Sequence, residues 1–327
     1  MRVPDVILKC VGFIGEVTHR DDSGVSGDLV ATGFIVALPC ESSAMAGLTT
    51  TYFVTAKHVA QDLKGREIYV LVNKVGGGVL TISQLGEHFW LHPSDKTADV
   101  AIIQIGGGQP ELDVRTITAG HLVTPDLIDK FDIGVGDEVF MTGLFTAVPG
   151  IEKNLPIVRH GNIAMMPTEQ IQTELGFADV YLIEARSIGG ISGSPVFVRP
   201  TALGKGMLAD GSSADMFAPG HGAFLLGVAH GHWDIKESDM NKPFFTHDGK
   251  RGVNMGIAIV VPAIKIYETL YRPELVMQRK KQEEEMLRRN VPLMDSAKPQ
   301  KDDKAPFTQA DFEDALKKAS RKVESKK

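Results

Sequence analysis

Short apolar runs, broken repeatedly by Gly, Pro, Asn or Asp, dominate positions 6 to 262 of the chain. Clear examples are Gly33–Leu38, Tyr52–Thr55, Ile68–Val72, Ala101–Ile105, Glu138–Gly143, Val180–Ile183 and Phe224–Ala229. Short runs that are rich in β-branched side chains and bounded by turn residues are typical of β-strands. The pattern therefore predicts an all-β sandwich or barrel, and periodicity alone does not choose between them.

Four segments stand out from this strand pattern. We expect a first strand over Val6–Val17 and a crossover between two halves of the fold over Asp113–Asp132. The stretch Gly204–Gly222 is rich in Gly, Ala, Ser and Asp, which predicts a long surface loop. Pro262–Tyr271 is expected to form a closing helix, because proline is favoured in the first helical turn.

The composition changes at Arg272-Pro273, after which Lys, Arg and Glu are dense up to residue 290. Farther on, the segment beginning at Phe307 has a capping pattern typical of a helix start. We predict a helical or disordered charged tail over 273–327. Two interpretations stay open, a weakly ordered tail or a recognition helix that docks on a partner protein or on the body of the chain.

Composition narrows the class of protein. The 327 residues carry a formal net charge of −6, which argues against a nucleic-acid partner. We expect no membrane association, because no uncharged apolar run reaches the length of a membrane span. Asp5 and Lys9 interrupt the apolar start of the chain, so it is a poor secretory signal. With only Cys10 and Cys40, the chain fits a reducing compartment, and we expect it in the cytoplasm.

Three motifs point to chemistry. His58 follows a strand in Thr55-Ala56-Lys57-His58-Val59, and Asp99 precedes a strand in Asp99-Val100-Ala101-Ile102. Ser192 lies in Gly190-Ile191-Ser192-Gly193-Ser194-Pro195. A serine between glycines, a histidine and an aspartate are the parts of a nucleophile, a base and a residue that orients the base.

The order His, Asp, Ser, with these motifs, resembles the trypsin-like serine peptidases of the chymotrypsin fold, in particular the bacterial Deg-type and glutamyl endopeptidase catalytic domains. The resemblance covers roughly residues 6–271. It implies two six-stranded antiparallel β-barrels, residues 1–120 and 121–272, with the active site between them. It also implies that Ser192 attacks, His58 shuttles the proton and Asp99 orients His58. The backbone N–H groups of Gly190 and Ser192 would form the oxyanion hole.

Substrate contacts follow from the same resemblance. The strand after the nucleophile would pair with the substrate backbone, which implicates Ala229, His230 and Gly231. Arg186 and His232 would flank the primary pocket, and their charge would suit an acidic side chain.

Ser194 is the alternative to Ser192 as nucleophile, and Asp95 is the alternative to Asp99 as the orienting carboxylate.

We expect no cofactor and no metal, because neither His230-x-His232 nor His88-x3-His92 has a matching cluster of Cys or carboxylates in the sequence. The sequence thus predicts a serine endopeptidase that forms an acyl-enzyme and acts on proteins or peptides. Two alternatives are a catalytically silent or gated module that binds peptides or partner proteins, and an esterase that uses the same site.

Overall fold

The structure is a computed structural model. It describes residues 3, 5–21, 24–83, 90–106, 111–173, 176–185, 190–200, 203–207, 213–217, 222–236 and 252–288. Residues 1–285 form one compact unit, and the second unit, 286–327, is described only at residues 286–288, the end of a helix. The expected division of the chain at residues 120 and 272 stays a prediction.

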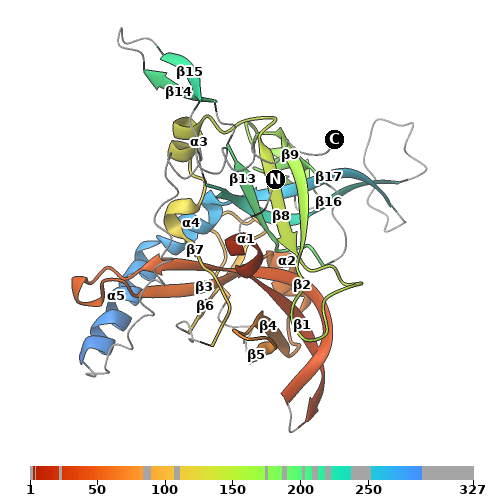
Figure 1. The fold of residues 1–327 in the computed structure, drawn as a ribbon, viewed down its shortest axis with the longest axis vertical. Coiled ribbons are helices and arrows are strands. Elements are labelled where there is room, and N and C mark those ends of the chain that lie inside the picture. The colour runs from red at the N-terminus through yellow and green to blue at the C-terminus, as the bar shows by residue number, and fades with distance from the viewer. Residues whose placement is uncertain are drawn as a thin grey trace, which may run out of the picture. The chain divides into compact units, whose positions relative to one another are not determined.

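The first half of the compact unit is a β-sheet (Figure 1, red to yellow). Six strands pair antiparallel in the order β5-β4-β1-β2-β3-β6, and the short β7 adds to β2 in parallel. The strands are β1 (Val11–Asp21), β2 (Gly24–Pro39), β3 (Thr49–Thr55), β4 (Ile68–Asn73), β5 (Val79–Ser83), β6 (Ala101–Ile105) and β7 (Ile117–Thr118).

The second half closes into a six-stranded antiparallel barrel, β12-β17-β16-β13-β8-β9. Its strands are β8 (Glu138–Gly143), β9 (Ile157–Met165), β12 (Tyr181–Glu184), β13 (Pro195–Arg199), β16 (Phe224–Lys236) and β17 (Gly252–Pro262). Two hairpins lie outside it, β10 (Ile171–Thr173) with β11 (Gly176–Ala178), and β14 (Leu203–Met207) with β15 (Ser213–Phe217). The predicted all-β fold class is confirmed. Of the two six-stranded antiparallel barrels expected, the second half is a closed six-stranded barrel, and the first half is a sheet of six antiparallel strands with β7 added.

Three apolar cores explain why these strands pack as they do. One is formed by residues of the first sheet, around Phe53 and Ile103, and one by residues of the barrel, around Met141 and Val196. The third joins residues of both halves, including Phe34 and Leu225, and is the contact surface between them. Alternating side chains therefore face a core on both sides of several strands, which is why these strands have apolar side chains at nearly every position.

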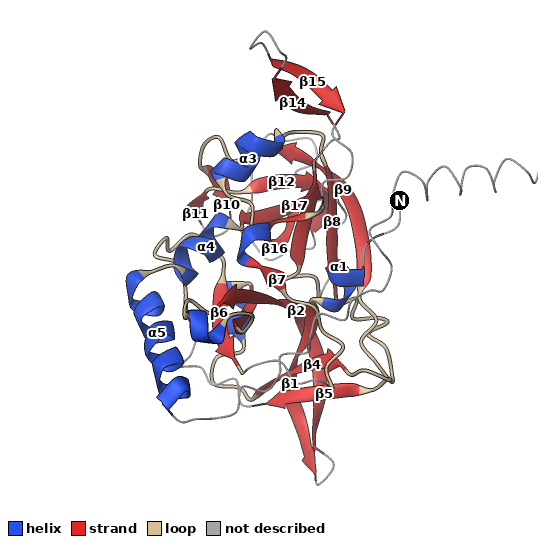
Figure 2. Ribbon diagram, turned by 60° about the vertical axis from the view of Figure 1, so that its left-hand side comes forward, coloured by secondary structure: helices blue, strands red, loops and turns tan. Residues whose placement is uncertain are grey.

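Short helices connect and cover the strands (Figure 2). They are α1 (Asp5–Lys9), η1 (Ser43–Met45), α2 (Lys57–Asp62), η3 (Ala119–His121), α3 (Pro125–Phe131), α4 (Ile264–Leu270) and α5 (Pro273–Arg288). Helix α4 lies within the closing helix expected over 262–271. None of the helices that the structure describes is long and apolar enough to cross a membrane.

Helix α5 belongs to the compact unit up to Glu285 and lies beside β3 and β6 (Figures 1 and 2). The buried carboxylate of Glu283 accepts hydrogen bonds from the backbone N–H groups of Glu41 and Ser42, at 3.1 and 2.9 Å. The buried Arg279 donates to the carbonyl of Leu270, at 2.7 Å. The start of the charged segment is thus a helix held by polar contacts, whereas residues 289–327 lie outside the described residues.

Two local expectations are wrong. The first strand begins at Val11 rather than Val6, because residues 5–9 form α1, which buries Ile7 and lets the Cys10 thiol donate to the Ile7 carbonyl at 3.4 Å. The segment expected as a loop, 204–222, contains the hairpin β14–β15. Its composition concealed the hairpin, because strand pairing is made by backbone groups and does not need apolar side chains.

Candidate active site

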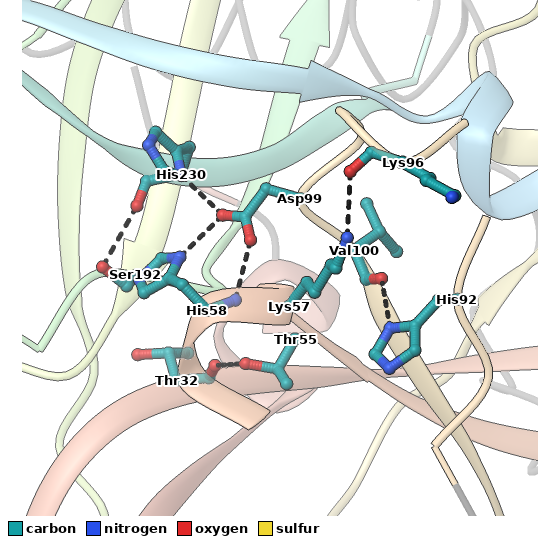
Figure 3. A network of polar contacts seen from close by, with 10 residues as sticks. All are labelled: Thr32, Thr55, Lys57, His58, His92, Lys96, Asp99, Val100, Ser192 and His230. Carbon is teal, nitrogen blue, oxygen red and sulfur yellow. Dashed lines mark hydrogen bonds and ion pairs between the residues drawn. The ribbon is translucent and has the colours of Figure 1, made fainter. Parts of the chain in front are cut away.

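His58 and Asp99 meet because β3 and β6 pair. Thr55, the last residue of β3, is opposite Ala101, the first residue of β6. His58 follows β3 by three residues, and Asp99 precedes β6 by two, so both lie at the same end of the sheet. The Asp99 carboxylate receives two hydrogen bonds from His58, from its backbone N–H to Oδ1 at 2.8 Å and from its ring Nδ1 to Oδ2 at 2.7 Å (Figure 3).

A second histidine contacts the same carboxylate. His230, on β16 in the second half of the chain, places its Nδ1 2.5 Å from Asp99 Oδ2. The His58 and His230 rings are edge to face, with centroids 5.1 Å apart. This contact was not predicted from the sequence, because His230 and Asp99 are separated by 131 residues and no motif links them.

Asp99 is kept ionised by these neighbours. Its exposed fraction is 1%, and burial alone would raise its pKa. The hydrogen bonds from His230 and His58, together with the electrostatic attraction of the two rings, outweigh burial and hold the pKa of Asp99 well below its ordinary value. An ionised carboxylate that accepts a hydrogen bond from Nδ1 fixes the ring tautomer, so the basic nitrogen of His58 is Nε2.

Ser192 lies in a tight turn that leads into β13. The turn is closed by a hydrogen bond from the Ser194 N–H to the Ile191 carbonyl, at 2.9 Å, and Gly190 adopts a φ of +92°, which favours glycine. The half-buried Ser192 hydroxyl donates to the backbone carbonyl of His230, at 3.2 Å. Ser192, His230, Asp99 and His58 thus form one connected polar network (Figure 3).

Thr32 of β2 joins the nucleophile turn to the first sheet. Its N–H donates to the Ser192 carbonyl at 3.1 Å, and its hydroxyl donates to the Gly190 carbonyl at 2.8 Å. The same hydroxyl accepts from the Leu144 N–H at 2.9 Å, and its carbonyl accepts from the Thr55 hydroxyl at 2.7 Å. Thr32 was not predicted as a site residue, although a lone hydroxyl in the apolar run Ala31–Leu38 was an available signal. A buried polar group needs such partners.

Ser194 and Asp95, the alternative nucleophile and the alternative carboxylate, both lie in other surroundings. Ser194 is fully buried, and its hydroxyl has no hydrogen-bond partner among the described residues, so it is not presented to a substrate. Asp95 accepts from Thr97 within its own loop and from the Lys265 ammonium of α4, at 2.9 Å. Arg272 donates to the carbonyl of His92 in the same loop, at 2.6 Å. The loop before Asp99 is therefore fastened to the C-terminal helices.

The expected substrate contacts are placed only in part. Ala229 is buried, and its backbone pairs with the nucleophile turn, accepting from the Gly193 N–H and donating to the Ser194 carbonyl, both at 2.9 Å. The His230 side chain is directed to Asp99, and the pairing of its backbone with a substrate stays a prediction. Gly231 and His232 continue β16 opposite Ile259 and Ala258, although only the backbone of His232 is described. Arg186 lies outside the described residues. The oxyanion hole at Gly190 and Ser192 stays a prediction.

Comparisons with known proteins find similarity in structure alone. No protein-family model matches the chain, and no curated protein matches it. The chain is similar to the MamO protease domain from Magnetospirillum magneticum, with 17% identity and a TM-score of 0.47, over 82% of this chain and 98% of that one. It is also similar to Deg5, with 14% identity and a TM-score of 0.43, over 84% and 92%. An inactive form of Rv3671c from M. tuberculosis has 14% identity and a TM-score of 0.39, over 81% and 87%.

These similarities are to proteins of the trypsin-like serine protease fold, which is the fold that the sequence motifs resemble. At such identities and scores they carry no inference about activity or substrate. The strand order of the first sheet and of the barrel defines the fold. A catalytic activity has to follow from the residues of the site.

Proposed function

We propose that the protein is a serine endopeptidase that cleaves proteins or peptides through an acyl-enzyme. The observation that carries the proposal is the double contact of His58 with the buried Asp99 carboxylate, because it holds the ring and reserves Nε2 as the base. Ser192, in the glycine-flanked turn of the same network, is the nucleophile. The chain is proposed to act in the cytoplasm, with a partner protein bound through residues 273–327.

In the proposed reaction, His58 Nε2 takes the Ser192 proton as the hydroxyl oxygen attacks the peptide carbonyl. The N–H groups of Gly190 and Ser192 stabilise the oxyanion. His58 then gives the proton to the leaving amine, and water, deprotonated by His58, releases the acyl group. Arg186 and His232 are proposed to favour an acidic side chain next to the cleaved bond.

A second candidate, a gated or silent peptide-binding module, is favoured by one observation. A hydroxyl has a single proton to donate, and Ser192 donates it to the His230 carbonyl. A serine in that arrangement is not donating to His58. In the gated form, substrate or partner binding would have to turn the hydroxyl toward Nε2.

Intact mass after treatment with a fluorophosphonate probe separates these candidates. The peptidase proposal expects one adduct on the metal-free full chain, no adduct on Ser192→Ala, and one adduct on the matched control Ser194→Ala. Peptide hydrolysis by Ser192→Ala should fall by on the order of 10⁶. A folded wild-type protein that takes no adduct and hydrolyses no peptide would exclude the proposal and favour the second candidate.

A further inference from the structure

We propose that His58, His230 and Asp99 form a binding site for one divalent transition-metal ion of the Zn²⁺ class, and that this ion competes with the proton arrangement needed for catalysis. The two ring nitrogens and one carboxylate oxygen lie within 4.8 Å of one another. They come from three segments, namely the start of α2, the loop that leads into β6, and β16. The site does not require that Ser192 be an active nucleophile.

The donor set suits this class of metal. Imidazole nitrogens bind Zn²⁺, Cu²⁺ and Ni²⁺ well, whereas Mg²⁺ prefers oxygen ligands. Two imidazoles and one carboxylate supply three of four tetrahedral positions, and the fourth is left for water or another ligand.

The geometry requires an adjustment at all three ligand atoms, which now lie within 4.8 Å of one another. Metal–ligand bonds of about 2.1 Å put tetrahedral ligand atoms roughly 3.4 Å apart. The two contacts to Asp99 Oδ2, now 2.7 and 2.5 Å, would have to open by less than about 1 Å on that estimate. His58 provides an entry path, because its side chain is 29% exposed, against 11% for His230.

Metal binding and catalysis exclude each other because both use Nδ1 of His58. A metal ion takes the Nδ1 lone pair, so a neutral imidazole must carry its proton on Nε2. Nε2 then cannot accept the Ser192 proton. Removing the ion returns the proton to Nδ1, where Asp99 accepts its hydrogen bond, and restores the base.

The test titrates Zn²⁺ into the full-length Ser192→Ala protein by calorimetry, with Mg²⁺ as the comparison ion. We expect one Zn²⁺ per chain and no heat of binding with Mg²⁺. His230→Ser should weaken Zn²⁺ by at least the roughly 10–100-fold that even the outer partners of metal ligands contribute. The matched control is His160→Ser, because His160 also faces a carboxylate, that of Glu138 at 3.5 Å, without belonging to the cluster. Equal Zn²⁺ affinity with and without His230 would overturn the proposal.

Two measurements keep the test independent of how the variants fold. Co²⁺ bound to the Ser192→Ala protein should give the intense visible absorption of a four-coordinate site, and a weak six-coordinate spectrum would count against the proposal. On the wild-type protein, saturating Zn²⁺ should slow fluorophosphonate labelling at least tenfold, and EDTA should restore it. If Zn²⁺ did not change the rate of labelling, metal binding and catalysis would not compete for His58. Labelling in the absence of metal tests the proposed peptidase activity separately.

Discussion

Lys265 of α4 donates a hydrogen bond to Asp95, which lies four residues before Asp99, at 2.9 Å. The two residues are separated by 170 positions, and the contact ties the closing helix to the loop that presents the active-site carboxylate. Arg272 strengthens the same connection through the His92 carbonyl. The position of Asp99 thus depends on residues near the C-terminal end of the compact unit.

This connection predicts an acid-dependent loss of stability. Burial would raise the pKa of Asp95, but hydrogen bonds from Thr97 and Lys265 lower it to about 2. The unfolded chain takes up this proton near pH 3.8 and the folded chain only near pH 2, so the stabilisation is present above about pH 4 and is lost as the pH falls toward 2.

In Lys265→Met, the pKa of Asp95 should move back up, and this part of the acid dependence should shrink. Urea midpoints between pH 6 and pH 2.5 measure the effect, with Lys130→Met as the control for loss of a positive charge elsewhere. If the two variants lost stability in parallel at every pH, the Lys265–Asp95 contact would not be contributing.

We predict that an alanine in the nucleophile turn, at Gly193, costs more unfolding free energy than an alanine at Gly47. Gly193 has a φ of +81°, and a Cβ there would lie 2.2 Å from both the Thr32 carbonyl oxygen and the Thr55 hydroxyl. Gly47 has a φ of +89° with open space around its Cβ position. Gly47→Ala should cost about 1–2 kcal/mol of unfolding free energy from backbone strain alone. Gly193→Ala should cost a further ~1–3 kcal/mol from the clash.

Chemical denaturation measures both glycine variants, and fluorophosphonate labelling should fall in Gly193→Ala only. Similar costs at the two positions would mean that Thr32 and Thr55 do not constrain the turn.

We predict that one charged side chain of helix α5, far from the site, contributes to the unfolding free energy. The Glu283 carboxylate accepts two backbone hydrogen bonds, one on each oxygen, and Glu283→Gln keeps only one acceptor oxygen. We expect a loss of about 1–3 kcal/mol in unfolding free energy, as for a buried hydrogen bond to a charged group. The exposed Glu285→Gln, two residues on, should stay within about 0.5 kcal/mol of wild type. Thermal or urea unfolding compares them, and equal values would exclude a docking role for Glu283.

The parts of the site that the sequence predicted are those with a local signature. His58 follows a strand, Asp99 precedes one and Ser192 lies between glycines, so each motif can be recognised within a few residues, and strand pairing brings the first two together. The contact of His230 with Asp99 has no local signature, because it depends on the packing of two halves of the fold. Arg279 and Glu283 were concealed for another reason. In sequence they are typical of a solvated charged face, and only their backbone partners make burial possible.

The Thr32 contacts join parts of the site that are synthesised at different times. A ribosome that has released the first sheet has already supplied His58, Asp99 and the Thr32 groups that will hold the nucleophile turn. The turn itself comes 158 residues after Thr32, and His230, Lys265 and Arg272 follow later still. The N-terminal part of a chain leaves the ribosome first. A nascent chain therefore carries an incomplete site, and the network of His58, Asp99, Ser192 and His230 can form only after His230 has been made.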